Sequence, residues 1–323
     1  MHAITIVEKA LHYSEVPDPI AGNEDLLVRI KATALNRADL MQRRGNYPQP
    51  GPAAAVEIPG LEYAGEVIGM GERVQGFALG DRVMGLLAGG GYAEQVAVHH
   101  RLAMKVPANL SWLEAGATPE VYITAHDALV QCGFTAGETF LIHAAGSGVG
   151  VAAIQIAKAM GASMVIGTAG SQEKLDQARA LGLDVGIDYH TQDFAEEVAK
   201  ATGGRGVDVI LDVIGADYWD RNLRSLALKG RMIIVGAMSG GNITGNIGML
   251  SAKRASVRGT VLRARPLEEK AAATRAFEKT VLPHLANGRI KVVIDRVFPL
   301  VEAGAAQAYM ESNANFGKIV LDV

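Results

Sequence analysis

The sequence contains a single cysteine, Cys132, among its 323 residues. One thiol excludes an intramolecular disulfide and any zinc site built from several cysteines. The chain also has no excess of basic residues, since its formal net charge is -3. It therefore lacks the positive field that draws proteins to nucleic acid or to anionic membranes, and we expect neither partner.

The chain has no recognisable signal peptide at Met1-His2-Ala3, so we expect a cytoplasmic location. Residues 139–157 contain no Asp, Glu, Lys or Arg and approach the length of a membrane span. However, His143 and the glycines at 146, 148 and 150 interrupt the run. A short apolar segment, a glycine-rich break and an alanine-rich segment predict a strand, a turn and a helix rather than a lipid-facing helix.

The composition, with 49% hydrophobic and 20% charged residues, is typical of an α/β protein. Its length favours two domains, each able to bury its own core. Up to about residue 119, short β-type runs alternate with Gly-Asn, Pro-Gly and Gly-Asp turn pairs. This rhythm predicts an antiparallel, barrel-like β domain with strands near residues 26–30, 65–68, 82–84 and 92–98.

From residue 120 the pattern changes to alternating strands and helices, which predicts a parallel sheet covered on both faces. Six strands are expected, the number found in a doubly wound dinucleotide-binding sheet. After a charged helix over residues 267–287, β-type runs return at 292–294, 297–298 and 318–323. We therefore predict a β-rich domain, residues 1–119 and 263–323, interrupted by a nucleotide domain, residues 120–262. The expected strands of the inserted domain are residues 140–142, 164–166, 185–187, 207–211, 232–235 and 256–257, with helices over 149–160 and 172–181.

Residues 140–150 read FLIHAAGSGVG, an apolar strand entering a glycine-rich turn from which a helix begins. The free N–H groups and positive dipole end of such a helix can hold a pyrophosphate. Ser147, Gly148 and Val149 would form the turn, and Gly150 would let the helix pack close to its strand. The plain G-x-G-x-x-G pattern is only partly met, so an ordinary packing connection is the alternative; the strand-turn-helix setting favours a dinucleotide.

The tip of the second inserted strand decides which dinucleotide is expected. An NAD site carries a carboxylate about 20 residues after the turn, where it binds the ribose 2′-hydroxyl. Residues 168–171, which include Gly170, offer small and neutral groups instead, and Lys174 follows. These groups suit a 2′-phosphate, so we predict NADPH. The alternative is that Lys174 is a solvated helix residue, and the neighbouring Glu173 is an argument for caution.

Several motifs together resemble one family along the whole chain. These are residues 34–43 (ALNRADLMQR) with Gly45-Asn46-Tyr47-Pro48, residues 59–62 (PGLE), 80–83 (GDRV), 144–150 (AAGSGVG), 215–219 (GADYW) and 313–318 (NANFGK). The chain resembles the zinc-free, zeta-crystallin-like quinone oxidoreductases of the medium-chain dehydrogenase/reductase superfamily, closest to the tumour-suppressor-inducible subgroup. The resemblance implies a GroES-like catalytic domain, a Rossmann cofactor domain, an active cleft between them and a homodimer formed near residues 256–261.

The resemblance also indicates where zinc would bind. In zinc-dependent relatives a cysteine occupies the position of Asn36, and a histidine precedes the position of Glu62. Here those places hold Asn36 and Leu61. An amide and an aliphatic side chain cannot replace a thiolate and an imidazole as zinc ligands, so we expect no metal.

By resemblance, Asn36 and Tyr47 lie near the nicotinamide, where an amide and a phenol could hydrogen-bond a carbonyl oxygen as it gains negative charge. A local turn former and a surface aromatic are the alternatives from sequence alone. Ser147 lacks the G-x-S-x-G setting of a nucleophile, and we expect His143 to pack rather than to transfer protons. The cofactor residues implied by the family are Thr124, Ser147, Gly148, Val149, Tyr189, Ile214, Met238 and Asn315.

The expected reaction is hydride transfer from NADPH to a quinone, a small acceptor whose reduced anion is stable without a dedicated acid. Two alternatives stay open. One is reduction of an alkenal or enone in the same site. The other is a crystallin-like or RNA-binding protein with residual cofactor affinity, which the net charge disfavours.

Overall fold

A computed structural model describes residues 1–47, 50 and 56–323 of the chain. Pro48, part of one of the motifs, lies outside the described residues. The chain divides into two compact units. We call residues 124–261 the inserted unit, and residues 1–123 with 262–323 the outer unit. The sequence placed these boundaries after residues 119 and 262, so Glu120 belongs to the outer unit rather than to the nucleotide domain.

The inserted unit is built on a six-stranded sheet whose paired strands are all parallel. Its strands occur in the order β10-β9-β8-β11-β12-β13. Except in the edge strand β13, whose side chains are mostly exposed, the strands are apolar runs with few exposed side chains, as in β8, where all four residues are buried. Such runs are typical of a parallel sheet covered on both faces. The strands are β8 (Thr139–Ile142), β9 (Met164–Ala169), β10 (Val185–Asp188), β11 (Val207–Asp212), β12 (Leu226–Ile234) and β13 (Ser256–Gly259).

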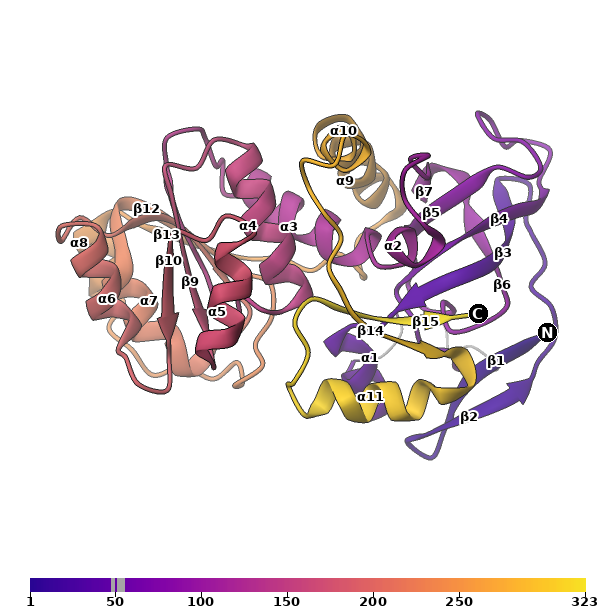
Figure 1. Cartoon of the computed structure of the whole chain (residues 1–323), viewed down its shortest axis with the longest axis horizontal. Coiled ribbons are helices and arrows are strands. Elements are labelled where there is room, and N and C mark those ends of the chain that lie inside the picture. Colours follow the sequence, from indigo (N-terminus) through magenta and orange to yellow (C-terminus); the bar gives the residue numbers. More distant parts are fainter. Residues whose placement is uncertain (48–49, 51–55) are drawn as a thin grey trace. The chain divides into compact units, whose positions relative to one another are not determined.

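Helices connect these strands and cover both faces of the sheet. Figure 1 shows α4 and α5 on one side of the sheet and α6, α7 and α8 on the other. The strand order reverses between β8 and β11, which is the point where doubly wound sheets bind ligands beyond their carboxyl ends. The helices are α3 (Pro119–Gln131), which begins in the outer unit, α4 (Gly148–Ala159), α5 (Gln172–Arg179), α6 (Phe194–Ala201), α7 (Trp219–Ser225) and α8 (Gly248–Lys253).

The uncharged stretch at residues 139–157 forms β8, a turn and α4, as the sequence predicted. Among the residues that the structure describes, no helix is long and apolar enough to cross a membrane.

The outer unit is centred on a sheet in the order β14-β15-β3-β4-β5-β7, with β6 also paired to β3. All its pairs are antiparallel except β14 with β15. Leu26, Val28 and Ile30 on β3 pack with Tyr63 and Val67 on β4 in the core of this sheet. The strands are β3 (Asp25–Ala34), β4 (Glu62–Met70), β5 (Arg82–Leu86), β6 (Gln95–His99), β7 (Ala103–Lys105), β14 (Ile294–Pro299) and β15 (Lys318–Asp322), and a separate hairpin comprises β1 (His2–Val7) and β2 (Ala10–Glu15).

Two details of the outer unit differ from the prediction. The expected runs at 292–294 and 297–298 are replaced by one strand, β14, which begins only at Ile294, and the single helix expected over 267–287 is two helices. Pro283 explains the second difference, because it starts a new helix and cannot donate to the preceding one. The helices of this unit are α1 (Arg37–Arg43), α2 (Trp112–Gly116), α9 (Leu267–Thr280), α10 (Leu282–Ala286) and α11 (Ala303–Glu311).

Candidate functional site

The glycine-rich turn after β8 has the local structure of a helix start. Ser147 has extended backbone angles and caps α4, and its hydroxyl accepts a hydrogen bond of 3.0 Å from the Gly150 N–H. A Cβ added to Gly150 would lie 2.3 Å from the Ala144 carbonyl oxygen, a separation that atoms do not tolerate. Only glycine lets the first turn of α4 lie this close to the chain leaving β8. The Ser147 hydroxyl therefore shapes the turn, as expected for a residue that is not a nucleophile.

A second close approach joins two predicted cofactor residues on neighbouring strands. A Cβ on Gly170, just after β9, would lie 2.5 Å from the Tyr189 hydroxyl oxygen, just after β10. Ser171 caps α5 by accepting a hydrogen bond from the Lys174 N–H at 3.3 Å. Lys174 is half-buried in the first turn of α5, whereas Glu173 is exposed. The tip of β9 is thus built from small groups, with one cationic side chain beside it.

The other predicted cofactor residues of the inserted unit are spread along the same sheet. Ile214 follows β11 and Met238 follows β12, and Met238 is 52% exposed. Because the carboxyl ends of parallel strands meet at one edge, the turn at residues 147–150, Gly170, Tyr189, Ile214 and Met238 lie along a single edge of the sheet. Thr124 is half-buried on α3 of this unit. Asn315 belongs to the outer unit, where its amide donates to the Gly317 carbonyl at 2.9 Å.

His143 is completely buried at the end of β8. Its ring nitrogens bond the Thr168 hydroxyl at 3.0 Å and the Asn222 amide oxygen at 2.7 Å. Burial lowers the pKa of His143 to about 4, so the ring is neutral and both nitrogens are used inside the protein. These contacts agree with the packing role predicted from the sequence.

The outer unit holds a buried polar cluster that the sequence did not reveal. The Lys318 ammonium, on β15, donates to Glu62 Oε1 at 2.7 Å, to Asn36 Oδ1 at 2.8 Å and to the Leu35 carbonyl at 2.7 Å. The Lys318 side chain is 4% exposed and the Glu62 side chain is fully buried. All three ammonium hydrogens have acceptors, which is the condition under which a buried charge is tolerated. We call Lys318, Glu62 and Asn36 the ammonium cluster.

Within this cluster the Asn36 amide is held on both sides. Its oxygen accepts from Lys318, and its nitrogen donates to Glu62 Oε1 at 2.9 Å and to the Ala34 carbonyl at 3.3 Å. The backbone N–H of Asn36 donates to Asp39 Oδ2 at 2.8 Å and so fixes the start of α1. Asn36 therefore positions its neighbours. The family resemblance predicts that its amide nitrogen donates to a substrate oxygen, and that bond would have to replace the longer of its two bonds, the one to the Ala34 carbonyl.

Glu120 borders the ammonium cluster at the beginning of α3. Its backbone N–H donates to Glu62 Oε2 at 2.8 Å. Its carboxyl group makes no hydrogen bond or ion pair with any residue that the structure describes. Burial, followed by the charge of Glu62, raises the pKa of Glu120 to about 8. Sequence reasoning missed this residue, although a glutamate in the apolar surroundings of residues 115–125 could have drawn attention.

Tyr47 lies beside a second buried cation of the outer unit. The Arg263 guanidinium stacks 4.8 Å from the centre of the Tyr47 ring and donates to the Tyr47 carbonyl at 3.0 Å. Burial raises the pKa of the Tyr47 phenol, with a further contribution from Glu120. The hydroxyl makes no hydrogen bond with the described part of the chain, so it is a free donor.

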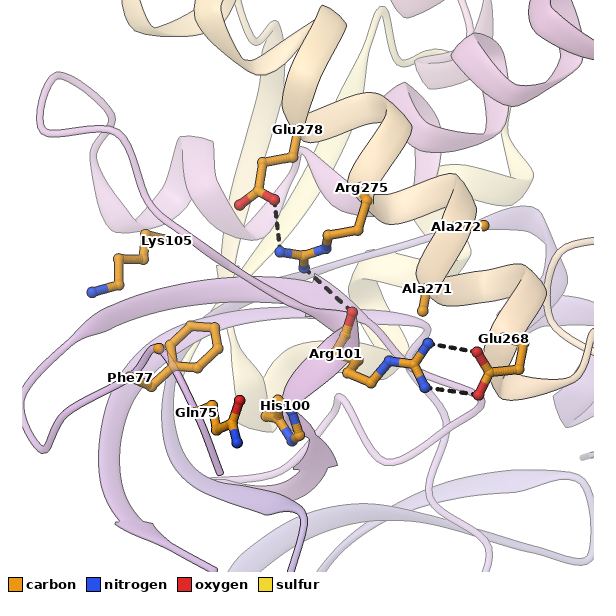
Figure 2. Close-up of a pocket in the computed structure, with 11 residues that line it drawn as sticks. Gln75, Phe77, His100, Arg101, Lys105, Glu268, Ala271, Ala272, Arg275 and Glu278 are labelled. Atoms are coloured by element: carbon orange, nitrogen blue, oxygen red, sulfur yellow. Dashed lines mark hydrogen bonds and ion pairs between the residues drawn. The ribbon is translucent and has the colours of Figure 1, made fainter. Parts of the chain in front are cut away.

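A surface hollow elsewhere in the outer unit does not include any of these residues. Figure 2 shows it between α9 and the segment that carries Arg101 and Lys105. Its cations are already neutralised: Arg101 pairs with Glu268 at 2.5 Å, Arg275 pairs with Glu278 at 2.6 Å, and Lys105 pairs with Asp81 at 3.0 Å. We assign no function to this hollow.

The chain matches two families of known proteins. Residues 22–108 match "Alcohol dehydrogenase GroES-like domain", and residues 148–279 match "Zinc-binding dehydrogenase". A quinone oxidoreductase of Pseudomonas aeruginosa is 32% identical over 320 residues, which cover 97% of this chain and 95% of that protein. The chain is also 31% identical to part of a phenolphthiocerol/phthiocerol polyketide synthase of Mycobacterium tuberculosis, a much longer protein of which it spans only 14%.

Solved structures agree with these matches over the full length of the chain. A quinone oxidoreductase of Pseudomonas syringae pv. tomato has a TM-score of 0.88 at 32% identity, with 100% of this chain and 99% of that chain covered. An NAD-dependent alcohol dehydrogenase has a TM-score of 0.89 at 33% identity, and a mycobacterial protein complexed with NADPH has a TM-score of 0.88 at 30% identity; both are covered completely, as is this chain.

Proposed function

Since the chain belongs to the medium-chain dehydrogenase/reductase superfamily, we propose that it is an NADPH-dependent oxidoreductase that reduces quinone-type acceptors without zinc. The observation that carries the proposal is the edge of the inserted sheet, where Gly150 and Gly170 allow neighbouring segments to approach so closely that a Cβ at either position would clash, as at the glycine-rich turns that hold dinucleotides. The full-length likeness to quinone oxidoreductases supports the choice of acceptor.

The groups at the tip of β9 support NADPH over NADH. Ser171 and Lys174 start α5 there, and no carboxylate occurs in residues 168–171 to bind a ribose 2′-hydroxyl. A hydroxyl, helical N–H groups and an ammonium are suited to a 2′-phosphate dianion. When bound, the cofactor would supply the hydride, while the turn at residues 147–150, Gly170, Lys174 and Tyr189 would hold it.

Zinc, which the family description implies, does not fit the residues of the outer unit. Asn36 and Leu61 stand where zinc-dependent relatives carry their cysteine and histidine. The Lys318 ammonium already binds Glu62 Oε1 and Asn36 Oδ1. A divalent cation would therefore be repelled by the ammonium charge and would not find these oxygen atoms available as ligands. Among the described residues, no three His, Cys, Asp or Glu side chains are grouped as metal ligands.

Tyr47 is the group that we propose for the acceptor's oxygen. A tyrosine phenol is protonated at neutral pH, and burial raises the pKa of Tyr47 further, so the hydroxyl can donate a hydrogen bond as that oxygen gains charge. The stacked Arg263 restricts the ring, which reduces the entropy lost on binding. Asn36 would act on the same acceptor either directly or through the groups that it orients.

Reduction of an alkenal or enone is the second candidate, and Glu120 favours it. The reduced form of such a substrate is a more basic anion than that of a quinone, so its reduction benefits more from an acid in the site.

The test is turnover by the purified protein, measured as consumption of NADPH or NADH in the presence of ortho-quinones or 2-alkenals. We expect NADPH and quinones to be preferred, with activity unchanged after incubation with a metal chelator. A decisive preference for alkenals would replace the first candidate with the second. Binding of NADPH without turnover of any acceptor would instead indicate a binding protein, the crystallin-like alternative.

We also propose a homodimer formed along β13, which is the last strand of the inserted sheet and has mostly exposed side chains. An edge strand with unpaired backbone groups can pair with a second copy of itself. Sedimentation equilibrium would reveal a monomer if this proposal is wrong. A cytoplasmic location remains an expectation from the sequence.

A further inference from the structure

Glu120 is held in place by its backbone while its side chain is left free. The N–H to Glu62 Oε2 bond of 2.8 Å ties the first turn of α3 to the ammonium cluster. Glu62 is itself fixed by Lys318 through its other oxygen, at 2.7 Å. The Glu120 carboxyl group, in contrast, is partly exposed and has no partner in the described part of the chain. A carboxylic acid whose backbone is fixed and whose carboxyl group has no hydrogen-bond partner in the described part of the chain is suited to proton transfer.

The groups around this carboxyl come from four other segments of the outer unit. Glu62 on β4 and Asp39 on α1 are acidic, whereas Lys318 on β15 and Arg263, which precedes α9, are basic. Tyr47 also lies within electrostatic reach. Burial and Glu62 favour the neutral acid, Lys318 and Arg263 favour the carboxylate, and the balance leaves the pKa of Glu120 at about 8. Below that pH Glu120 carries a proton that it can give away.

Resting on the proposed function, we propose that Glu120 is the acid that protonates the acceptor after it has received the hydride. When bound, the cofactor would supply a hydride, the hydrogen of its C–H bond together with both bonding electrons, to the acceptor. This leaves an anion on the acceptor, an enolate or a phenolate. That anion takes the proton of the Glu120 carboxyl group, whose O–H bond breaks and whose electrons stay on the carboxylate. Water then reprotonates Glu120, so each turnover consumes one hydride and one solvent proton.

In this proposal Lys318 is a positioning residue. Its ammonium neutralises Glu62 and fixes the Glu62 carboxylate, which accepts the hydrogen bond from the Glu120 backbone N–H. Without this neutralisation, the full charge of Glu62 would act on Glu120 and raise its pKa further, so that the acid would be weaker.

The two candidate acceptors make the proposal testable, because they need the proton to different degrees. A quinone anion is stable in water, whereas the enolate of a 2-alkenal is strongly basic and returns to substrate unless it is protonated. We therefore compare E120Q with the wild-type protein on both acceptors at saturating NADPH. The glutamine keeps the size of the side chain and the backbone bond to Glu62, but its amide is not an acid. E269Q is the matched control, since Glu269 is also in the first turn of a helix but is exposed.

With a 2-alkenal we expect kcat of E120Q to fall about 100-fold, within the usual range for loss of a general acid. The wild-type kcat should be level below pH 8 and should decrease above it as the Glu120 acid is lost, whereas the E120Q profile should show no such decrease. The solvent deuterium isotope effect on kcat should be larger in E120Q, because water must then donate the proton in the slow step. Quinone turnover should change less than 10-fold, and E269Q should match the wild type on both acceptors.

Unchanged alkenal turnover, pH profile and isotope effect in E120Q would overturn the assignment of Glu120 while leaving the oxidoreductase function intact. If the wild-type protein reduces neither acceptor, the proposed function fails and Glu120 has no reaction to serve. A merely structural role is recognised by two further measurements, because it would weaken NADPH binding and lower Tm without altering the pH profile. In E120A, added acetic acid should restore part of the alkenal activity; absence of rescue together with an unchanged pH profile would count against the proposal.

Discussion

Lys318 Nζ and Glu62 Oε1 lie 2.7 Å apart, although the two residues are separated by 256 positions in the chain. Both side chains are almost entirely removed from solvent, at 4% and 0% exposure. The pair joins β15 to β4 across the intervening β3. A buried pair of this kind stabilises a protein only while both partners are present.

Replacing Lys318 with Met should therefore destabilise the outer unit severely. The variant K318M leaves the Glu62 carboxylate buried without its ammonium partner, at a cost of about 3–5 kcal/mol. Urea unfolding would measure this as a lower midpoint at constant slope. The double variant E62Q/K318M removes both charges and should be more stable than K318M alone. Equal stability of the two variants would show that the lost packing of the lysine, not its charge, dominates.

Gly150 should not tolerate a side chain. In G150A the new Cβ would lie 2.3 Å from the Ala144 carbonyl, so the start of α4 must shift. We expect a loss of about 2 kcal/mol in stability, as for other overpacked sites, and weaker NADPH binding measured by fluorescence titration. G304A is the control, because Gly304 also lies in the first turn of a helix but faces open space, and alanine there should leave stability unchanged or raise it by up to about 1 kcal/mol. Equal behaviour of the two variants would contradict this account of the turn.

The inserted unit could be predicted closely from the sequence. Apart from β13, its strands are largely buried apolar runs bounded by turns, and five of the six strands begin within one residue of the predicted place. The exception is β12, which begins at Leu226, whereas the prediction began this strand at residue 232. The turn at residues 147–150, Gly170 and Lys174 were predicted from that pattern, because a strand-turn-helix succession determines which loops reach the carboxyl edge of the sheet. The other cofactor residues of this unit, Thr124, Tyr189, Ile214 and Met238, were predicted from the family resemblance. Gly170 beside Tyr189 is an example of two predictions that the fold brings together.

The ammonium cluster could not be predicted in the same way. Asn36, Glu62 and Lys318 are polar residues at the ends or starts of their elements, where exposure is the usual expectation. Their burial results from the pairing of β15 with β3 and of β3 with β4, which no local pattern specifies. Glu120 was missed for the same reason, since the pKa of a carboxyl depends on neighbours that only the tertiary fold supplies. The helix α1 was not recognised either, because its motif was interpreted through resemblance alone.

Lys174 should distinguish the two nicotinamide cofactors. If its ammonium binds the 2′-phosphate, K174A should raise KM for NADPH about 10-fold or more and leave KM for NADH nearly unchanged, because NADH lacks that phosphate. E173A is the control, since Glu173 is adjacent on α5 but exposed and should not lower the affinity for NADPH. Steady-state kinetics with both cofactors would check the prediction. Equal effects on the two would remove the argument for NADPH.

His143 should make the inserted unit sensitive to acid. Its pKa falls from an ordinary 6.5 to about 4 in the folded chain because burial disfavours the charged ring. Between these values the unfolded chain binds a proton that the folded chain does not, so His143 reduces stability as pH falls from about 6.5 to 4, by about 3 kcal/mol in total. Asp39 and Asp212 act in the opposite direction, because burial raises the pKa of each to about 6. The His143 contribution is therefore isolated by comparing variants rather than by the wild-type curve alone.

The variant H143Q can keep both kinds of hydrogen bond, since its amide can accept from Thr168 and donate to Asn222, but it cannot be protonated in this range. We expect it to be less stable than the wild type at pH 7, and to lose less stability between pH 6.5 and 4. Urea unfolding at several pH values would measure the difference. H12Q is the control, because His12 is exposed on β2 and its replacement should leave the slope unchanged. Parallel curves for H143Q and the wild type would mean that His143 is protonated in the folded protein as readily as in the unfolded chain.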